Sequence, residues 1–376
     1  MRPLPSILHF AKYYPPEKGG MESVTQVLAE GLAQAGHPVR VLCFTKDKAG
    51  TEQRRGVSII RVPVELERAS QPLGWRYFIK GLKAARQADV VHLHAPNLLA
   101  SLMCRLLPRR VKLLVHWHSD VVGKGRLGAM VQPVERHMLS RADVVAATSQ
   151  AYADASPMLA KVKHKVQVIP IGIPAPRADA LQAKRDFDAF LAGRQFVLAL
   201  GRLVPYKGFS VLVDAAQHLP VGCVVVVAGS GPLAGELADQ VRRLGLQDRV
   251  LLAGRVSDAE LEYLFSRAMA FCLPSVERSE AFGVVLLEAM ARGVPCVATT
   301  IAGSATSWVN QHGVSGVNVP PADPIALAAA IEALLVDPAR RTQLAAGAVA
   351  RFGDLFTAEK SVEGFAEIYQ RLAGGS

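Results

Sequence analysis

Two glutamates flank the stretch of the chain whose residues are best suited to bind a ligand or take part in chemistry. Glu280 and Glu288 stand eight residues apart. A glycine and a proline that follow them would stop any helix, so we expect a short helix that opens near Gly283. The backbone amides of Phe282, Gly283 and Val284 would then face out of the helix N-terminus, which is a favourable place for an anion.

This arrangement of two carboxylates around an anion site suits one class of ligand. A sugar nucleotide would place its phosphates at the helix N-terminus, its sugar hydroxyls on one of the two glutamates and its ribose on the other. The alternative is an amphipathic helix with two solvated glutamates, and for this stretch alone the two interpretations are equally good. The apolar run at 269–273 predicts a buried strand before the loop, and strand–loop–helix junctions are where open α/β sheets bind ligands.

A second cluster follows the predicted strand at 196–200. Its loop carries Arg202 and Lys207, with Gly201 before them and Gly208 behind. The glycines allow close backbone approach. A pyrophosphate presents about two negative charges, which one arginine and one lysine can offset without a metal. Two ordinary surface cations are the alternative, but the strand, the glycines and the spacing together favour a phosphate site.

Strand-like and helix-like runs alternate along the whole chain and would position these residues. They predict two doubly wound α/β domains, and 376 residues are enough for two cores. The proline- and glycine-rich stretch Pro170-Ile-Gly-Ile-Pro-Ala-Pro176 is the expected link. Predicted strands lie at 6–10, 39–44, 57–62, 89–93, 111–116, 143–147, 166–169, 196–200, 222–228, 249–253, 269–273, 295–298 and 316–319. Predicted helices include 20–36, 75–87, 97–106, 131–141, 150–160, 324–336 and 357–373.

Further candidate residues end predicted strands of the first domain. Gly19 and Gly20 follow the first strand, where close approach to a phosphate or an acceptor would require bare backbone; a plain helix-start turn is the alternative. His118 and His116 close the strand at 111–116. A histidine at the carboxyl end of this strand would face the site, and we expect His116 to pack in the core. His92 and His94 also close a strand, and we expect them to be structural.

Three short sequence motifs of this chain, and the order in which they occur, resemble those of the large retaining glycosyltransferase family 4, whose fold is GT-B. The motifs are Pro15-Pro-Glu-Lys-Gly-Gly20, Gly201-Arg-Leu-Val-Pro-Tyr-Lys-Gly208 and Glu280-x7-Glu288, and the resemblance covers nearly the whole chain. It implies two Rossmann-like domains that face each other across a cleft. Residues 1–170 would bind the acceptor, 171–356 would bind the nucleotide sugar, and the last helix, within 357–376, would cross back to the first domain.

The resemblance also implies roles for single residues. Four would act on the reacting groups: His118, Arg202, Lys207 and Glu280. The last three of these would also hold the donor, together with Gly19, Gly20, Arg255, Val256, Phe282, Gly283, Val284 and Glu288. In the family the histidine lies beside the transferred sugar, and the loop with Arg255 and Val256 packs on the nucleobase. The acceptor attacks from the front face, the leaving diphosphate takes its proton, and no metal or other cofactor is expected.

Two groups of acidic residues have competing interpretations. Asp258 could accept hydrogen bonds from guanine, or it could only start a helix together with Ser257. Asp186-Phe-Asp188 has the form of a metal motif from another glycosyltransferase fold. It follows no predicted buried strand, so we expect a solvated surface there.

Charge is divided unevenly between the two halves. Residues 1–170 carry a net charge of +13 and residues 171–376 a net charge of −2. No nucleic-acid motif accompanies the basic half, so an anionic membrane is the favoured acidic partner. The basic segments 75–86 and 97–112 could each lie at a membrane or pack in the core. Five separated cysteines, no apolar run of eighteen and no signal peptide predict a cytoplasmic protein, peripheral on the inner face of the plasma membrane.

Two further motifs resemble one subgroup of the family and bear on the donor and the pathway. Tyr13-Tyr-Pro-Pro16 and His118-Ser-Asp120 look most like bacterial mannosyl- or rhamnosyltransferases of surface-polysaccharide synthesis, such as that of O-antigen or exopolysaccharide. We therefore expect a GDP-sugar as the donor and a lipid-linked glycan as the acceptor, with a UDP-sugar as the alternative donor. A sugar-nucleotide 2-epimerase of the same fold and an inactive sugar-nucleotide-binding protein are the other hypotheses, and the intact charged residues argue against both.

Overall fold

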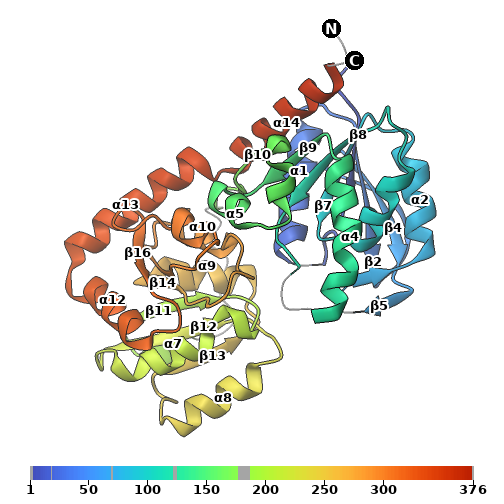
Figure 1. Ribbon diagram of the computed structural model, residues 1–376. Helices are drawn as coiled ribbons and strands as arrows, with labels where there is room; N and C mark the ends of the chain where they lie inside the picture. The colour runs from blue at the N-terminus through green and yellow to red at the C-terminus, as the bar shows by residue number, and fades with distance from the viewer. Residues whose placement is uncertain (1–2, 18, 69–70, 122–124, 177–186, 375–376) are drawn as a thin grey trace. The chain divides into compact units, whose positions relative to one another are not determined.

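Two compact units make up the protein in this computed structural model, which describes residues 3–17, 19–68, 71–121, 125–176 and 187–374. The first unit comprises Met1–Pro174 and Phe356–Ser376, and the second comprises Ala175–Leu355. Each is a mainly parallel sheet with helices packed against it (Figure 1). The predicted α/β class, with two doubly wound domains, is confirmed.

The first unit is built on an eight-stranded sheet with the order β10-β9-β8-β7-β1-β2-β4-β3. Neighbouring strands are parallel except at the edge, where β3 pairs antiparallel with β4. The strands are β1 (Ile7–Phe10), β2 (Val39–Thr45), β3 (Gly50–Arg54), β4 (Val57–Pro63), β7 (Val90–Ala95), β8 (Lys112–Trp117), β9 (Val144–Ala147) and β10 (Val166–Val168). The strand order reverses between β1 and β7, which is where sheets of this type bind ligands.

Helices from both ends of the chain belong to the first unit. They are α1 (Gly20–Gln34), α2 (Trp75–Ala85), α3 (Leu98–Met103), α4 (Gly125–Arg141), α5 (Gln150–Ala155) and α14 (Ala358–Gly374). Three-residue strands β5 (Leu66–Arg68) and β6 (Gln71–Leu73) form a separate hairpin. The helix α14 packs tightly on α1, since a methyl group added to Gly31 would overlap Val362.

The second unit contains a six-stranded parallel sheet with the order β13-β12-β11-β14-β15-β16. Its strands are β11 (Gln195–Leu200), β12 (Cys223–Ala228), β13 (Val250–Gly254), β14 (Ala270–Leu273), β15 (Cys296–Thr299) and β16 (Gly316–Val319). Its helices are α6 (Asp188–Leu191), α7 (Phe209–Ala215), α8 (Ala234–Arg243), α9 (Asp258–Arg267), α10 (Val284–Met290), α11 (Thr306–Val309), α12 (Pro324–Val336) and α13 (Pro338–Leu355). This strand order is that of dinucleotide-binding folds, and it reverses between β11 and β14.

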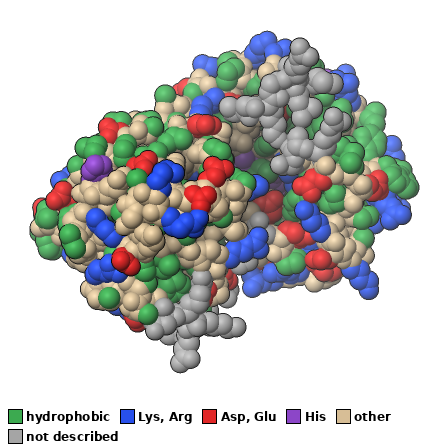
Figure 2. Space-filling model, turned by 90° about the horizontal axis from the view of Figure 1, so that it is seen from below, with side chains coloured by type: hydrophobic (Ala, Val, Ile, Leu, Met, Phe, Trp, Pro, Cys, Tyr) green, Lys and Arg blue, Asp and Glu red, His purple; other side chains and the backbone are tan. Residues whose placement is uncertain are grey.

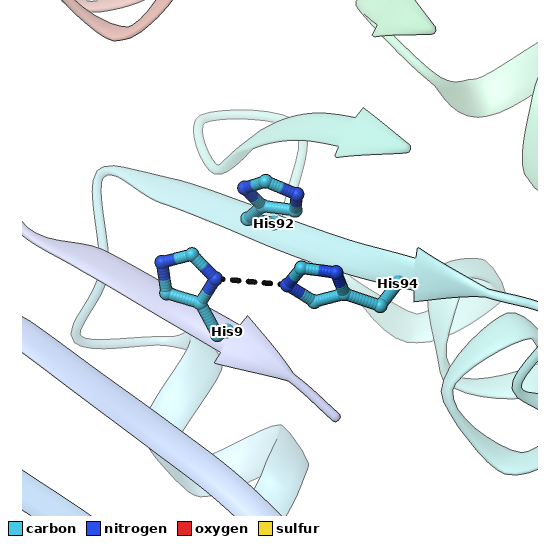
Figure 3. A group of neighbouring side chains, drawn as sticks. All are labelled: His9, His92 and His94. Atoms are coloured by element: carbon cyan, nitrogen blue, oxygen red, sulfur yellow. Dashed lines mark hydrogen bonds between the residues drawn. The ribbon is translucent and has the colours of Figure 1, made fainter. Parts of the chain in front are cut away.

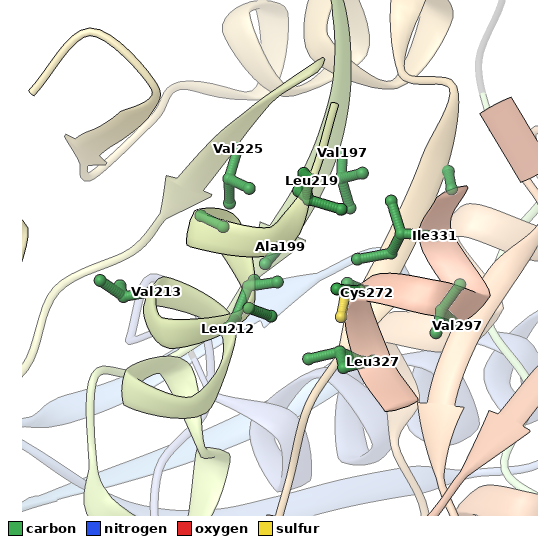
Figure 4. Packing of buried hydrophobic residues seen from close by; sticks show 14 of the residues in the cluster. Val197, Ala199, Leu212, Val213, Leu219, Val225, Cys272, Val297, Leu327 and Ile331 are labelled. Carbon is green, nitrogen blue, oxygen red and sulfur yellow. The ribbon is translucent and has the colours of Figure 1, made fainter. Parts of the chain in front are cut away.

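Apolar side chains of β11, α7 and α12 form the core on one face of the second sheet. Val197 and Leu212 face Leu327 and Ile331 there (Figure 4). Strands covered on both faces are apolar throughout rather than alternating, and β12 is buried over its whole length. Truncating such a leucine to alanine costs about 2–5 kcal/mol. The core therefore fixes the strand ends from which the candidate loops leave.

Some elements differ from the predictions. The strand β3 was not predicted because its side chains are polar and largely exposed, so its sequence has no alternation. The helix α13 was also missed, although Pro338 occupies the first helical position that proline favours. The prediction started a helix at 131, with Pro133 in its first turn, but α4 starts at Gly125 and holds Pro133 inside.

Candidate functional site

The loops that follow β11 and β14 meet through one buried ion pair. The Nζ atom of Lys207 lies 2.5 Å from Oε2 of Glu280, and both side chains are buried. The Ser275 hydroxyl donates to the same carboxylate oxygen at 3.0 Å. Two residues from separate sequence blocks thus come together at the point where the strand order reverses.

Glycine at position 208 is required by the contact between these two loops. Gly208 has a φ of +66°, and a methyl group there would overlap the carbonyl of Pro274. The neighbouring N–H of Val276 donates to the carbonyl of Tyr206 at 2.8 Å. The sequence predicted close backbone approach at Gly208, and the group that approaches it is the Pro274 carbonyl.

The helix α10 begins where the glutamate block predicts. Gly283 precedes it with a φ of +80°, and the first amides of any helix have no partner within the helix. Glu288 lies inside α10 and is partly buried. Burial raises the pKa of Glu288 to about 7, although Arg292 opposes the shift. This carboxyl group can therefore change its charge near neutral pH.

The loops after β11, β12 and β13 carry two arginines. Arg202 is exposed directly after β11. Arg255 follows β13, and its Nε donates to the hydroxyl of Ser230 at 3.0 Å. Val256 is partly buried beside it. These side chains leave the same edge of the sheet as Lys207, because all six strands are parallel.

The helix-start interpretation of Ser257 is confirmed. Its hydroxyl accepts from the N–H of Glu260, and the Glu260 carboxylate accepts from the N–H of Ser257, which makes a capping box. Asp258 is the first residue of α9, where a negative charge is favourable. Its interaction with guanine stays a prediction.

In the first unit, Gly19 and Gly20 lie at the start of α1. Gly19 caps the helix with extended backbone, and a methyl group added to Gly20 would meet nothing within 4 Å. A methyl group on Gly19 would overlap the carboxylate of Glu22. Burial raises the pKa of Glu22. Sequence reasoning missed this glutamate, which stands one helical turn after the glycine.

His118 follows β8 and is buried, with 8% of its surface exposed. Its Nε2 lies 3.0 Å from Nδ1 of His94. Burial lowers the pKa of His118 to about 3, and Lys12 adds to the effect, so the ring is neutral at pH 7. His116 and His92 are buried too, as predicted. The sequence treated these histidines one by one and did not predict that they would form a group.

The Asp-x-Asp stretch is only partly described. Asp188 is exposed, accepts from the Tyr263 hydroxyl at 2.6 Å, and lies 2.5 Å from the guanidinium of Arg267. Asp186 lies outside the described residues. The position of Asp188 agrees with the predicted solvated surface.

Two family models match the chain, one in each half. The model described as Glycosyltransferase Family 4 matches residues 18–177, and that of Glycosyl transferases group 1 matches residues 182–351. The chain is 31% identical over 374 residues to O-antigen chain mannosyltransferase C of Escherichia coli, covering 97% of this chain and 98% of that protein. It is 33% identical over 359 residues to D-rhamnosyltransferase WbpZ of Pseudomonas aeruginosa, covering 94% of this chain and 92% of that protein.

Solved structures share the fold over nearly their whole length. Sucrose-phosphate synthase from Thermosynechococcus elongatus superimposes with a TM-score of 0.80 at 24% identity, covering 99% of this chain and 100% of that one. Anabaena Alr3699/HepE in complex with UDP and glucose gives a TM-score of 0.79 at 21% identity, covering 98% of this chain and 100% of that one. At these identities the likeness concerns the fold alone.

Proposed function

The chain belongs to glycosyltransferase family 4, with the GT-B fold, and from that premise we propose that it transfers a hexose from a nucleotide-diphosphate sugar, with retention, to a glycan. The donor binds to the second unit and the acceptor to the first. The observation that carries this proposal is the buried contact between Lys207 and Glu280 at the reversal of the strand order.

Lys207 and Glu280 can serve the donor while they remain in contact. An ammonium group has three N–H donors, so Lys207 can donate to Glu280 and also to a diphosphate oxygen. Its contact and that of Ser275 both fall on Oε2 of Glu280, so Oε1 can accept from the sugar's 3- and 4-hydroxyls. Arg202 and the first amides of α10 add further donors to the diphosphate. Glu288 holds the ribose.

The reaction needs no side chain as nucleophile. The bond from the sugar's anomeric carbon to the diphosphate oxygen breaks, and a bond to the acceptor oxygen forms on the same face. The acceptor proton passes to the leaving diphosphate. Lys207, Arg202 and the α10 amides stabilise the charge that grows on that group, which is the main catalytic contribution in this scheme. No metal is required for it.

The named relatives support a particular donor and pathway. A mannosyltransferase and a rhamnosyltransferase favour a GDP-sugar donor and a lipid-linked glycan acceptor in bacterial surface-polysaccharide synthesis. A UDP-sugar is the second candidate, because a structural neighbour is described with UDP and glucose. Asp258 favours guanine only if its carboxylate reaches the base.

The basic surface of the first unit supports docking at an anionic membrane. The helix α2 exposes Trp75 and Ile79, one turn apart, with Arg76, Lys80 and Lys83 around them. Apolar and basic side chains on one exposed helix face are typical of interfacial helices. No helix in the described ranges is both long and apolar enough to cross a bilayer. Figure 2 shows basic and acidic side chains intermingled over the face that it draws, so we assign the docking to α2 rather than to overall charge.

An assay of the purified protein with each nucleotide sugar, with and without an acceptor, tests the proposal. Release of the nucleoside diphosphate that depends on the acceptor, with a glycosylated product, supports a transferase. Conversion of the sugar without acceptor would point to an epimerase, and binding without turnover to an inactive binding protein. A thermal-shift comparison of GDP, UDP and ADP selects the donor, since a ligand at a hundred times its Kd adds about 2.7 kcal/mol.

A further inference from the structure

Five buried histidines lie together on one face of the first sheet: His9, His92, His94, His116 and His118. Parallel pairing sets His9 beside His92 and His94 beside His116. Residues in register on neighbouring strands project to the same face, which explains how positions so far apart in sequence meet. Phe365 and Tyr369 of α14 pack against them. The family resemblance assigns a role only to His118.

A shared metal ion does not fit this group. Two sets of three histidines bring possible ligand atoms within 4.8 Å of one another. Imidazole binds a metal in the plane of its ring, at about 2.0–2.1 Å for zinc. His92 and His94 stack face to face, with centroids 4.3 Å apart and planes 13° apart, and His116 and His118 stack similarly at 4.0 Å and 26°. Two ring planes that are so nearly parallel intersect far beyond metal-binding distance, so one ion cannot lie in the planes of both stacked rings. Figure 3 shows this stacking for His92 and His94.

Three of the rings are instead joined edge to edge. Nδ1 of His9 lies 3.1 Å from Nε2 of His94, and Nδ1 of His94 lies 3.0 Å from Nε2 of His118. Figure 3 shows the first of these bonds, with His92 stacked beside it. The result is an imidazole chain that runs from His9 in the sheet to His118 at its carboxyl edge.

The inner end of the chain determines where the protons lie. Nε2 of His9 is buried and has no hydrogen-bond partner among the described residues. A neutral imidazole has one N–H and one bare nitrogen, and an orphaned buried N–H is rarer than an unpaired acceptor. His9 is therefore protonated on Nδ1 and donates to Nε2 of His94. His94 must then carry its own proton on Nδ1 and donate to Nε2 of His118.

We propose that His9 and His94 are positioning residues that hold His118 in its Nδ1–H form, so that His118 offers the substrate a hydrogen-bond donor rather than a base. The catalytic meaning of this inference rests on the proposed function. A donor suits a reaction in which the leaving diphosphate, not a histidine, takes the acceptor proton. Burial supports the neutral state by lowering the pKa of both His9 and His118 to about 3.

The tautomers can be measured directly in the full-length protein. Selective ¹⁵N labelling of histidine and a long-range ¹H–¹⁵N NMR spectrum at pH 7 distinguish Nδ1–H, Nε2–H and imidazolium rings. Loss of one signal set in His118→Gln and another in His9→Asn assigns the two ends. We expect Nδ1–H at both. An Nε2–H or charged His118 overturns the proposal, and this measurement requires no enzymatic activity.

Variants of His9 test whether the chain acts at a distance. His9→Leu removes the donor, whereas His9→Asn keeps an N–H near the position of Nδ1. We expect His9→Leu to leave His118 as a mixture of both neutral tautomers and to lower kcat/KM about tenfold, roughly the value of one hydrogen bond. His9→Asn should keep a larger share of the Nδ1–H tautomer and a higher kcat/KM than His9→Leu. His116→Phe is the matched control, because it keeps a stacked ring at a position that is not part of the imidazole chain. It should change neither the tautomer of His118 nor kcat/KM.

The outcomes separate this inference from the proposed function. The expected tautomers in a protein that transfers no sugar would support the imidazole chain and refute the function. Transfer by a protein whose His118 carries Nε2–H would refute the chain alone. Equal losses in His9→Leu and His116→Phe, with the His118 tautomer unchanged, would make His9 a packing residue. If His9→Leu fails to fold, the wild-type spectrum decides.

Discussion

Lys207 and Glu280 neutralise each other in the second unit, with 8% and 7% of their surfaces exposed and 2.5 Å between Nζ and Oε2. A buried pair of this kind adds little net stability over an apolar pair. Removal of one partner is costly, at about 3–5 kcal/mol, because it leaves the other charge buried alone. The pair therefore couples the stability of the loops to the chemistry that we propose for them.

We expect Lys207→Ala to lower transfer by about 10²-fold or more, the usual scale for one electrostatic stabiliser. It should also lower the free energy of unfolding, because the Glu280 carboxylate loses its cation. Adding Glu280→Gln should restore part of the stability and none of the activity. Urea denaturation and kcat measurements on both single variants and the double variant check this. Near-normal turnover in a folded Lys207→Ala protein would refute the assigned role.

Transfer should continue in excess EDTA. Lys207, Arg202 and the α10 amides offer the diphosphate the positive charge that a divalent cation supplies in other transferases. The assay compares rates before and after chelation, and again after Mg²⁺ or Mn²⁺ is added. An enzyme that stops in chelator and restarts with the cation would contradict the diphosphate assignment and reopen the question of Asp186 and Asp188.

The buried histidines should make the protein sensitive to mild acid. In the folded protein the pKa values of His9 and His118 fall from 6.5 to about 3. Below pH 6.5 the unfolded chain therefore binds protons that the folded chain cannot. The free energy of unfolding should fall by up to about 1.4 kcal/mol per histidine for each pH unit, down to the folded pKa, with no contribution above pH 6.5.

Urea denaturation at pH 7.5, 6.5 and 5.5 measures that slope. His116→Phe removes one such group, because burial also holds the pKa of His116 well below its usual value. The variant should therefore lose stability less steeply between pH 6.5 and 5.5 than the wild type. Identical slopes in the two proteins would mean that His116 is protonated in the fold.

Nucleotide binding should strengthen as the pH rises through 7. The carboxyl group of Glu288 has a pKa of about 7 and accepts ribose hydroxyls best when it is ionised. Binding at pH 6 must first remove its proton, so affinity should be about tenfold higher at pH 8 than at pH 6. Calorimetry with the preferred nucleoside diphosphate gives Kd at each pH. Glu288→Gln has no such proton, and a pH dependence that is as large in this variant as in the wild type would exclude Glu288 as its source.

Vesicles rich in anionic lipid should bind the protein through α2. Each basic residue near the surface contributes about 1 kcal/mol, and salt screens this attraction over about 10 Å at 0.1 M. We expect Lys80→Glu and Trp75→Ala each to weaken co-sedimentation. Arg243→Glu, on the exposed surface of the second unit, is the charge-matched control and should sediment like the wild type. Equal losses in Lys80→Glu and Arg243→Glu would point to net charge instead.

The parts of the site that follow strands were predictable from the sequence. Gly293 and Pro295 fix the end of α10, and the apolar runs before Arg202 and Glu280 place both loops at the carboxyl edge of one sheet. The contact between Lys207 and Glu280 needs the strand order as well. Apolar patterning does not encode that order, so the sequence could place both residues at the site without predicting their ion pair.

The histidine group was not predictable from local patterns. His9, His92 and His116 each occupy an ordinary buried strand position, and only the register of three strands brings them together. The role of Gly208 was hidden for a similar reason, since the carbonyl that approaches it comes from the loop after a different strand. Local sequence indicates which conformation and degree of burial a residue can adopt. Its contacts depend on which strand and which loop lie next to it in the sheet.

The helix α14 has a consequence for folding during synthesis. The hydroxyl of Tyr369 lies 2.5 Å from Nδ1 of His92, and Phe365 packs against His92 and His116. The ribosome makes Phe365 and Tyr369 only after the whole second unit, whereas domains generally begin to fold as they emerge. In a nascent chain the histidine face of the first unit therefore stays uncovered until α14 has been synthesised, and chaperones can bind to it. The part of the protein that is synthesised first is consequently the last part to be completed.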